Sequence, residues 1–203
     1  MVIIGIDPGA TIGLCVYDTT AGRALFACDH TDAIEAYNHV KHLDEVHDAS
    51  AIGIERSRIY GIGGNKVAYT IEQVGWFVGK LGIQIPPGSN EVLDCGYSVH
   101  LIERRLVTGA LTKAIGQTVL TDAGVWAALK ALHPNADRRP VAGVPGRPAE
   151  PPRLRAGSKS KWTIGKPEVA EVPAVEAGPL YGVSSHARSA LAVAWALGKH
   201  LEG

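Results

Sequence analysis

Short apolar runs separated by turn sequences fill the first thirty residues of the chain. Val2–Ile6, Ile12–Tyr17 and Arg23–Asp29 are rich in β-branched and other apolar residues, which is typical of strands. Asp-Pro-Gly at residues 7–9 and "DTTAG" at residues 18–22 provide turn chemistry between them. Because these links are short, the predicted strands must be antiparallel neighbours.

The next part of the chain alternates between helical and strand patterns. In Asp32–Val46 the apolar residues recur at helical spacing, and Ser50–Ile54 is another apolar strand, which ends at Glu55. A Gly-rich loop leads to a predicted helix over Lys66–Leu81, with Asn65 as its N-cap. Gly75 and Gly79 would let another backbone approach this helix closely.

The remaining elements complete an α/β order. The predicted fifth strand consists of Ile83–Ile85 and Glu91–Cys95, with a Pro-Pro-Gly interruption between them. Three helices are predicted after it, over Tyr97–Leu106, Asp122–Leu132 and Ser184–Leu201, and Thr121 or Asp122 caps the second of them. Three antiparallel strands followed by alternating helices and strands predict a mixed sheet flanked by helices.

Asn135–Pro179 breaks this pattern. Pro, Gly, Arg and Lys dominate it, which predicts a long basic loop or arm within a single domain that spans residues 1–203. The formal net charge of zero hides an asymmetry: residues 1–137 carry 10 Lys/Arg and 15 Asp/Glu, whereas residues 138–203 carry 10 Lys/Arg and 5 Asp/Glu. Such an imbalance bears on charged partners.

Composition narrows the class of protein. With 46% hydrophobic and 20% charged residues, the chain fits an ordinary globular protein. No apolar run is long enough to span a membrane and no signal pattern opens the chain, so the default expectation is a cytoplasmic protein without a membrane partner. Cys15, Cys28 and Cys95 lie far apart and suggest neither a disulfide framework nor a zinc site; buried apolar positions are the expected role for them.

Candidate chemistry begins with acids at strand ends. Asp7 follows the first predicted strand and Glu55 the fourth, and the two carboxylates meet if these strands are neighbours. His186 and Ser189, three residues apart, share one face of the last helix. Carboxylates with water and substrate phosphate suit Mg²⁺, and two ions about 3.5–4 Å apart can drive phosphodiester hydrolysis.

Each residue also has a simpler interpretation. Asp7 taken alone would cap its turn, and Glu55 would pair with Arg56, Arg58 or another base. His186 taken alone would be a capping or surface residue, and the histidines at 39, 42 and 47 are expected on a solvated helix face. Two acids flanked by apolar runs are costly if buried and unpaired, which favours a shared function.

Three motifs in order resemble the RuvC-like Holliday junction resolvases: "GIDPG" (Gly5–Gly9), "IGIERS" (Ile52–Ser57) and "SHARSALAVA" (Ser185–Ala194). The continuation "ERSRIYGIGGN" resembles short resolvase-like proteins of phages. The resemblance implies an α/β, ribonuclease H-like mixed five-stranded sheet flanked by helices. It also implies a Mg²⁺-dependent endonuclease with two ions, Mn²⁺ as a substitute, and a homodimer that resolves four-way DNA junctions.

The resemblance also implies a ligand set. Asp7, Glu55 and His186 match the family's metal-binding positions and, with Ser189, its catalytic positions. Ser189 is a departure, because the family commonly has aspartate there. Either the second ion binds weakly, or the hydroxyl acts through water, or Glu72, Asp94 or Asp122 supplies the missing charge; loss of activity is the remaining alternative.

Two regions are expected to contact DNA. The first is the loop after Glu55, which offers Arg56, Arg58, Tyr60 and Asn65 close to the metal site. The helix predicted next to this loop, over Lys66–Leu81, would be the natural dimer interface. The basic segment, whose alternative interpretation is a solvated linker, would bind phosphates without sequence preference through Arg153, Arg155, Lys159 and Lys161 among others. Trp162 would either stack on an exposed base or anchor the segment.

Three other functions fit parts of the pattern. "DPGATIGLCVYD" resembles the first phosphate loop of the actin and sugar-kinase ATPases, but that class needs two such domains. A non-catalytic DNA-binding module is favoured by Ser189. A flap or branched-DNA nuclease would keep the same chemistry with less demand for four-way symmetry.

Overall fold

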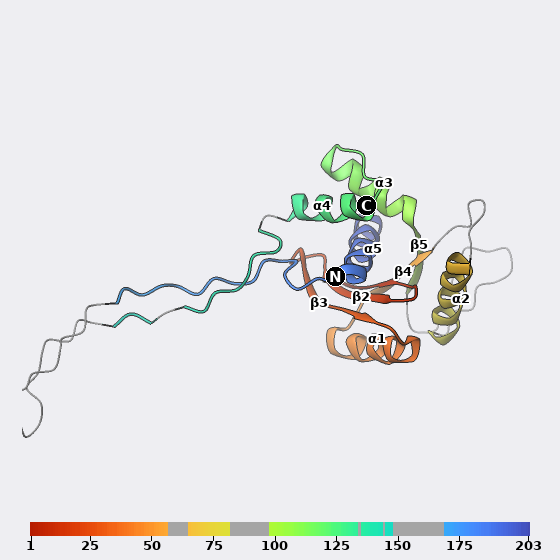
Figure 1. Ribbon diagram of the computed structural model, residues 1–203, viewed down its shortest axis with the longest axis horizontal. Helices are drawn as coiled ribbons and strands as arrows, with labels where there is room; N and C mark the ends of the chain where they lie inside the picture. Colours follow the sequence, from red (N-terminus) through yellow and green to blue (C-terminus); the bar gives the residue numbers. More distant parts are fainter. Residues whose placement is uncertain (57–64, 82–97, 134, 144, 148–168) are drawn as a thin grey trace, which may run out of the picture. The chain divides into compact units, whose positions relative to one another are not determined.

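The computed structural model describes residues 1–56, 65–81, 98–133, 135–143, 145–147 and 169–203 (Figure 1). These residues form two units: one comprises Met1–Asp137 with Pro179–Gly203, and the other is Arg138–Gly178. The predicted loop over residues 57–64, most of the basic segment and both parts of the expected fifth strand lie outside the described residues.

A five-stranded mixed sheet forms the centre of the first unit. Its order is β3-β2-β1-β4-β5, and the strands are Val2–Asp7 (β1), Ile12–Asp18 (β2), Arg23–His30 (β3), Ala51–Arg56 (β4) and Val99–Glu103 (β5). β1 pairs with β2 and β2 with β3 in antiparallel register, as the short turns require, whereas β4 lies parallel to both β1 and β5. These pairings confirm the predicted mixed sheet.

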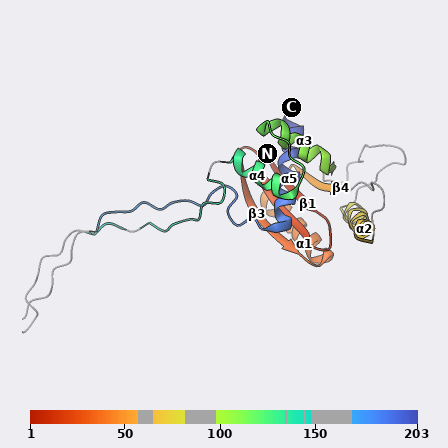
Figure 2. The same ribbon diagram turned by 45° about the horizontal axis from the view of Figure 1, so that its top comes forward.

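Helices cover both faces of this sheet (Figures 1 and 2). Ile4, Ile6, Leu14 and Ile54 are buried with the helices α1 and α2 on one face, while α3, α4 and α5 bury Ile3 and the other side of the sheet. Alternate strand residues point to opposite faces, so each apolar strand supplies both cores. The bounds are Ala33–His47 (α1), Asn65–Lys80 (α2), Arg104–Ile115 (α3), Asp122–Leu132 (α4) and Ser185–Glu202 (α5).

One element prediction was wrong. The helix expected over Tyr97–Leu106 is replaced by strand β5 and by the first turn of α3, which begins at Arg104. Val99 and Ile102 are buried in β5, and the strand pairs in parallel with β4 from Ile52↔Val99 to Arg56↔Glu103. A five-residue apolar run has no decisive period of its own, so pairing with an available strand edge determined its conformation.

Local capping explains two of the helices that the sequence predicted well. The Asp32 carboxylate accepts hydrogen bonds from the backbone N–H groups of Ile34 and Glu35 at the start of α1. The Thr121 hydroxyl accepts one from Gly124 N–H and starts α4. Gly75 and Gly79 on α2 have no described atom within 4 Å of a Cβ built on them.

The second unit contains a paired stretch of backbone. Val141 and Val175 exchange two backbone hydrogen bonds of 2.9 Å each, and Arg147 and Val169 do the same. Both pairs are antiparallel. The described part of this unit therefore contains two isolated antiparallel bridges, and its basic side chains include Arg138, Arg139 and Arg147.

No helix among the described residues is long and apolar enough to cross a membrane.

Candidate active site

Asp7 and Glu55 lie at the same end of two paired strands. The parallel register aligns Ile6 of β1 with Ile54 of β4, so the acids that follow these residues are adjacent. The side chains are 19% and 11% exposed respectively, although both are carboxylates. The condition set by the sequence, that the first and fourth strands be neighbours, is therefore met.

Helix α5 crosses the sheet close enough to place its first turns over Asp7. A Cβ atom on Gly13 would overlap the backbone of His186, and one on Gly5 would overlap the carbonyl of Ala190. Only glycine at these positions allows the backbone of the helix to approach the strands so closely. Figure 2 shows α5 lying across the sheet.

This approach brings both predicted α5 residues to Asp7. His186 Nδ1 lies 3.7 Å from Asp7 Oδ2. The Ser189 hydroxyl faces Asp7 as well and acts to lower the pKa of its carboxyl, which favours the charged form of Asp7.

Arg104 is a site residue that the sequence analysis missed. It is the first residue of α3, and its Nη1 donates a hydrogen bond of 3.2 Å to Glu55 Oε2. Its Nη2 contacts Asp122, the first residue of α4. Glu55 therefore pairs with a base that is remote in sequence rather than with neighbouring Arg56, and Asp122 joins the site through Arg104.

Asp29 is the second residue that was missed. It ends the third predicted strand, which was the available signal, and its carboxylate accepts hydrogen bonds from Ser184 Oγ at 3.0 Å, Ser185 Oγ at 3.2 Å and Ala187 N at 2.8 Å. An acid from β3 thus caps the N-terminus of α5, where a negative charge is also favoured by the helix dipole. This cap fixes the turn that carries His186.

Burial raises the pKa of both acids. Desolvation brings the pKa of Asp7 to about 7, with Arg104 and the Ser189 hydroxyl acting against the rise and Asp122 and Asp29 adding to it. Desolvation, together with the charge of Asp7, likewise brings the pKa of Glu55 to about 7, with Arg104 opposing the rise. Two adjacent carboxylates at this pKa are a common feature of functional sites.

The donor set fits a hard divalent cation. Two buried carboxylates and an imidazole supply oxygen and nitrogen ligands, and a cation would offset the cost of their burial. Their ligand atoms are more widely spaced than in a closed site, since they form no group within 4.8 Å of one another. Arg104 at Glu55 also supplies a positive charge that a second cation would have to tolerate.

Other predicted residues are placed less fully. Arg56 is exposed at the end of β4, Glu72 is exposed on α2, and Asn65 begins α2. Predicted contact residues that lie outside the described part of the chain are Arg58, Tyr60, Asp94, Arg153, Arg155, Lys159, Lys161 and Trp162.

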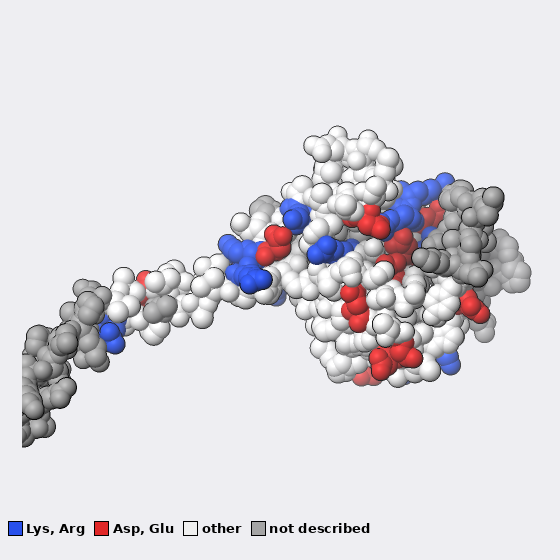
Figure 3. All heavy atoms as spheres, viewed as in Figure 1, with Lys and Arg blue, Asp and Glu red and all other residues white. Residues whose placement is uncertain are grey.

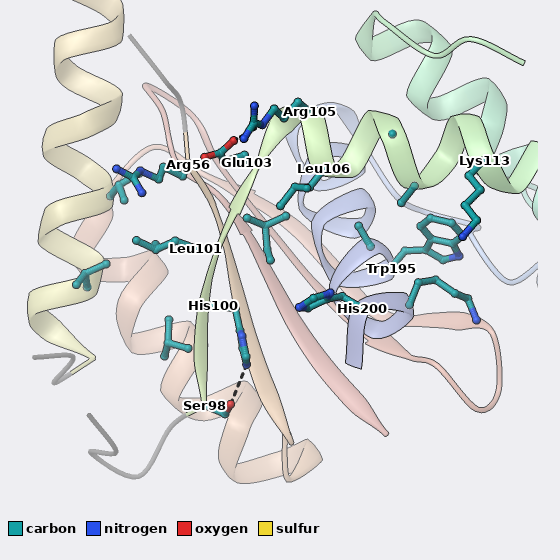
Figure 4. Close-up of a pocket in the computed structure, with 18 of the residues that line it drawn as sticks. Arg56, Ser98, His100, Leu101, Glu103, Arg105, Leu106, Lys113, Trp195 and His200 are labelled. Carbon is teal, nitrogen blue, oxygen red and sulfur yellow. Dashed lines mark hydrogen bonds and ion pairs between the residues drawn. The ribbon is translucent and has the colours of Figure 1, made fainter. Parts of the chain in front are cut away.

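A groove of about 1570 Å³ runs along β5 beside α2, α3 and the end of α5 (Figure 4). Its lining includes Arg56, Leu101, Leu106 and Trp195. Asp7 and Glu55 do not line it. The acids therefore form a separate site at the ends of β1 and β4.

Exposed acidic residues of the first unit also gather on helix α1, away from Asp7 and Glu55. Figure 3 shows acidic side chains over the part of the molecule where α1 lies, and this helix carries exposed Glu35 and Glu45. Such a face would repel a phosphate backbone.

Comparison with solved structures identifies the fold. RuvC of Thermus thermophilus in complex with a Holliday junction substrate matches with a TM-score of 0.54 and 17% identity over 100% of this chain and 95% of that chain. A structure of RuvC alone from Thermus thermophilus gives a TM-score of 0.53 and 16% identity, covering 100% and 96%. No protein-family model and no curated protein sequence matches the chain.

These matches show a RuvC-like, ribonuclease H-like fold, a class of α/β protein with a mixed five-stranded sheet flanked by helices. The predicted fold class is confirmed. The similarity extends over nearly the whole length of RuvC from Thermus thermophilus.

Proposed function

We propose that the chain is a divalent-metal-dependent endonuclease that resolves four-way DNA junctions by phosphodiester hydrolysis. The observation that carries this proposal is the pair of buried carboxylates, Asp7 and Glu55, at adjacent strand ends beneath the first turns of α5. The similarity to a RuvC bound to a Holliday junction substrate supports the choice of branched DNA.

Asp7, Glu55 and His186 would hold Mg²⁺, or Mn²⁺ in its place. When bound, such an ion polarises a phosphodiester and lowers the pKa of water, and a pair of ions does both. Ser189 would favour the charged, metal-binding form of the Asp7 carboxylate, since its hydroxyl acts to lower the pKa of Asp7. Arg104 fixes Glu55 and compensates part of its charge, which matters because Ser189 leaves the site one acid short of the family pattern.

DNA would be held by positive side chains near the site and on the second unit. Arg56 is exposed directly after Glu55, and Arg58, Tyr60 and Asn65 follow it in sequence. The second unit supplies Arg153, Arg155, Lys159 and Lys161 for phosphate contacts, which would make binding strongly dependent on salt. Charge-neutral replacement of Arg56 and Arg58 together is expected to weaken junction binding.

A homodimer would provide the two active sites that symmetric junction cutting needs. Helix α2 is the expected interface: Tyr69 and Ile71 are exposed, and Gly75 and Gly79 leave open space for a second backbone. Sedimentation equilibrium of the full chain tests this arrangement, and a strictly monomeric protein would contradict it.

The test of function is a cleavage gel. Four-way junction, flap and linear duplex are each incubated with the protein in Mg²⁺ or Mn²⁺, beside Asp7→Asn. We expect symmetric nicking of the junction by the parent and none by the variant. If Asp7→Asn cuts as well as the parent, the metal-site proposal is wrong; preferential cutting of the flap would favour the branched-DNA nuclease instead.

Replacing Ser189 restores the missing acid. Ser189→Asp is expected to raise the affinity for Mg²⁺ by about tenfold or more, because the number of charged ligands sets the affinity of carboxylate sites. The measurement is the junction-cleavage rate over a Mg²⁺ titration, with Ser189→Asn as the uncharged control. A Mg²⁺ dependence that is the same in both variants would contradict a ligand role at this position.

A second candidate function is a non-catalytic DNA-binding module of the same fold. The ion pair between Arg104 and Glu55 favours it, since a guanidinium beside the acid can replace a cation. Tight junction binding without cleavage in Mg²⁺ or Mn²⁺, unchanged in Asp7→Asn, would establish this alternative.

A further inference from the structure

Three soft-metal ligands converge between β3 and α1, away from the acids. Cys28 and His30 are two residues apart on β3 and so point to the same face of the strand. His39 faces them from α1, where its ring packs against Phe26 at a centroid distance of 4.8 Å. His39 is half-buried, so the solvated helix face expected for it was wrong. The expected burial of the cysteines is confirmed for Cys15, whereas Cys28 is half-buried against the core.

The spacing of the donor atoms suits one ion. Cys28 Sγ lies 3.2 Å from His30 Nε2 and 3.8 Å from His39 Nδ1, and the two nitrogens are 2.9 Å apart. In a tetrahedral zinc site with bonds of about 2.0–2.3 Å, neighbouring donors are about 3.3–3.6 Å apart. The observed distances lie within about half an ångström of that arrangement, and only small side-chain shifts separate the two.

Surrounding groups also prepare the histidines for coordination. The Glu35 carboxylate lies 4.0 Å from His30 Nδ1, whereas the other ring nitrogen, Nε2, is the one that faces Cys28 and His39. The His42 ring stacks beside His39 at a centroid distance of 6.5 Å and is exposed. The ligand atoms of Cys28, His30 and His39 all lie within 4.8 Å of one another, and no other three His, Cys, Asp or Glu residues in the described part of the chain do so.

We propose that Cys28, His30 and His39 form a binding site for a Zn²⁺-class transition-metal ion, with His42 or water as the fourth ligand. Thiolate and imidazole are the ligands of Zn²⁺ and its neighbours rather than of Mg²⁺. The site is thus chemically distinct from the acids, and the proposal does not depend on the proposed nuclease function.

Protonation is compatible with this role. Burial, then the charges of His30 and His42, lower the pKa of His39, so its ring is neutral at pH 7 and able to coordinate. Burial raises the pKa of the Cys28 thiol to about 11, so the thiol is protonated before the metal binds. Formation of the metal–sulfur bond therefore releases this proton to the buffer.

The ion would fasten an edge strand. In the described sheet β3 pairs only with β2. A metal ion bound by Cys28, His30 and His39 would tie the last residues of β3 to helix α1, which covers this face of the sheet. Asp29 lies between the two ligands on β3 and points to the opposite face, where it caps α5. The metal would therefore hold the strand end on which the α5 cap depends.

The experiment uses Co²⁺ as a spectroscopic probe and Zn²⁺ as the ligand for stability. Both are added to the EDTA-treated full chain carrying Asp7→Asn, so that the acid site does not contribute an ion. We expect one Co²⁺ per chain with thiolate-to-metal charge transfer and tetrahedral ligand-field bands, and displacement of Co²⁺ by Zn²⁺. With Zn²⁺ at 100 times its Kd, the Tm should rise by about 5–10 °C.

Matched variants decide which residues bind. Cys28→Ser should abolish the charge-transfer band and His39→Gln should weaken Co²⁺ binding at least about tenfold, whereas His47→Gln on the same helix should change neither. Circular dichroism without metal checks that each variant is folded. In the unmutated chain, bound Zn²⁺ should protect the Cys28 thiol from alkylation, and this measurement needs no substitution. Binding that persists unchanged in Cys28→Ser, or a spectrum without a thiolate band, would overturn the proposal.

Discussion

Two ligand clusters on opposite sides of one sheet differ in almost every physical respect. The acid cluster around Asp7 and Glu55 lies under α5, consists of hard oxygen donors, and has a guanidinium beside it. The cluster of Cys28, His30 and His39 lies under α1, consists of sulfur and nitrogen donors, and is more tightly spaced. The acids are the more deeply buried of the two groups, whereas Cys28, His30 and His39 are all partly exposed.

The comparison shows how one strand can serve both clusters. On β3, Cys28 and His30 face α1 while Asp29 between them faces α5. The period of two along a strand places the proposed metal ligands and the acid that caps α5 on adjacent residues. The predictions below separate the two clusters by what each should control.

The largest expected effect distinguishes the clusters by activity. Glu55→Gln should lower the rate of junction cleavage at least about 100-fold, because it removes one of the proposed metal ligands. Cys28→Ser should leave the cleavage rate within about threefold of the parent rate at 25 °C, since Cys28 lies on the other face of the sheet. Single-turnover cleavage of a four-way junction in saturating Mg²⁺ measures both.

A strong loss in Cys28→Ser with retained folding would contradict the separation of the clusters. A fully active Glu55→Gln would remove Glu55 from the proposed ligand set.

The second effect is on stability as a function of pH. In the folded protein the pKa of Asp7 is raised to about 7, above its value of about 4 in the unfolded chain. The native state therefore binds more protons between these values, so the free energy of unfolding without metal falls as pH rises from about 4 to 7. Asp7→Asn should remove this loss and be more stable than the parent by roughly 4 kcal/mol at pH 8, since each pKa unit corresponds to about 1.4 kcal/mol.

Urea unfolding in EDTA at pH 5 and pH 8 measures this difference. His39, His100 and His133, whose pKa values are lowered by burial, act in the opposite direction, but they are common to both proteins and cancel in the comparison. Saturating Mg²⁺ should stabilise only the parent. Equal stabilities at pH 8 would show that Asp7 does not carry a buried charge.

The smallest effect concerns the link between the clusters. Asp29→Ala removes the acceptor at the start of α5 and should cost about 1–2 kcal/mol, or about 3–6 °C in Tm. The Co²⁺ spectrum of the Cys28 cluster should persist, because Asp29 points to the other face. Thermal unfolding and absorption spectra measure the two, with Glu45→Ala on exposed α1 as the control.

A Tm that matches the control would show that the cap contributes nothing. Loss of the Co²⁺ spectrum would show that the two faces of β3 are not independent.

The sequence predicted the acid site better than its surroundings. Asp7 and Glu55 interrupt apolar runs, and such an interruption is visible in one dimension. Arg104 could not be found this way: it lies 49 residues after Glu55 and follows a strand that the pattern gave as a helix. A short apolar segment takes its conformation from its neighbours in the sheet, so the error in β5 and the omission of Arg104 have one cause.

By itself the sequence determined the strands, the caps and the chemical types of the residues. β-branched runs, turn residues and capping side chains act over a few residues, and they defined most of the sheet and the starts of α1 and α4. Only the tertiary structure decided which side chains meet. The close approach of α5 at Gly5 and Gly13 brought Ser189 to Asp7, and the packing of α1 on β3 brought His39 to Cys28. These contacts depend on the burial of two helix faces, which is a property of the folded sheet and not of any local segment.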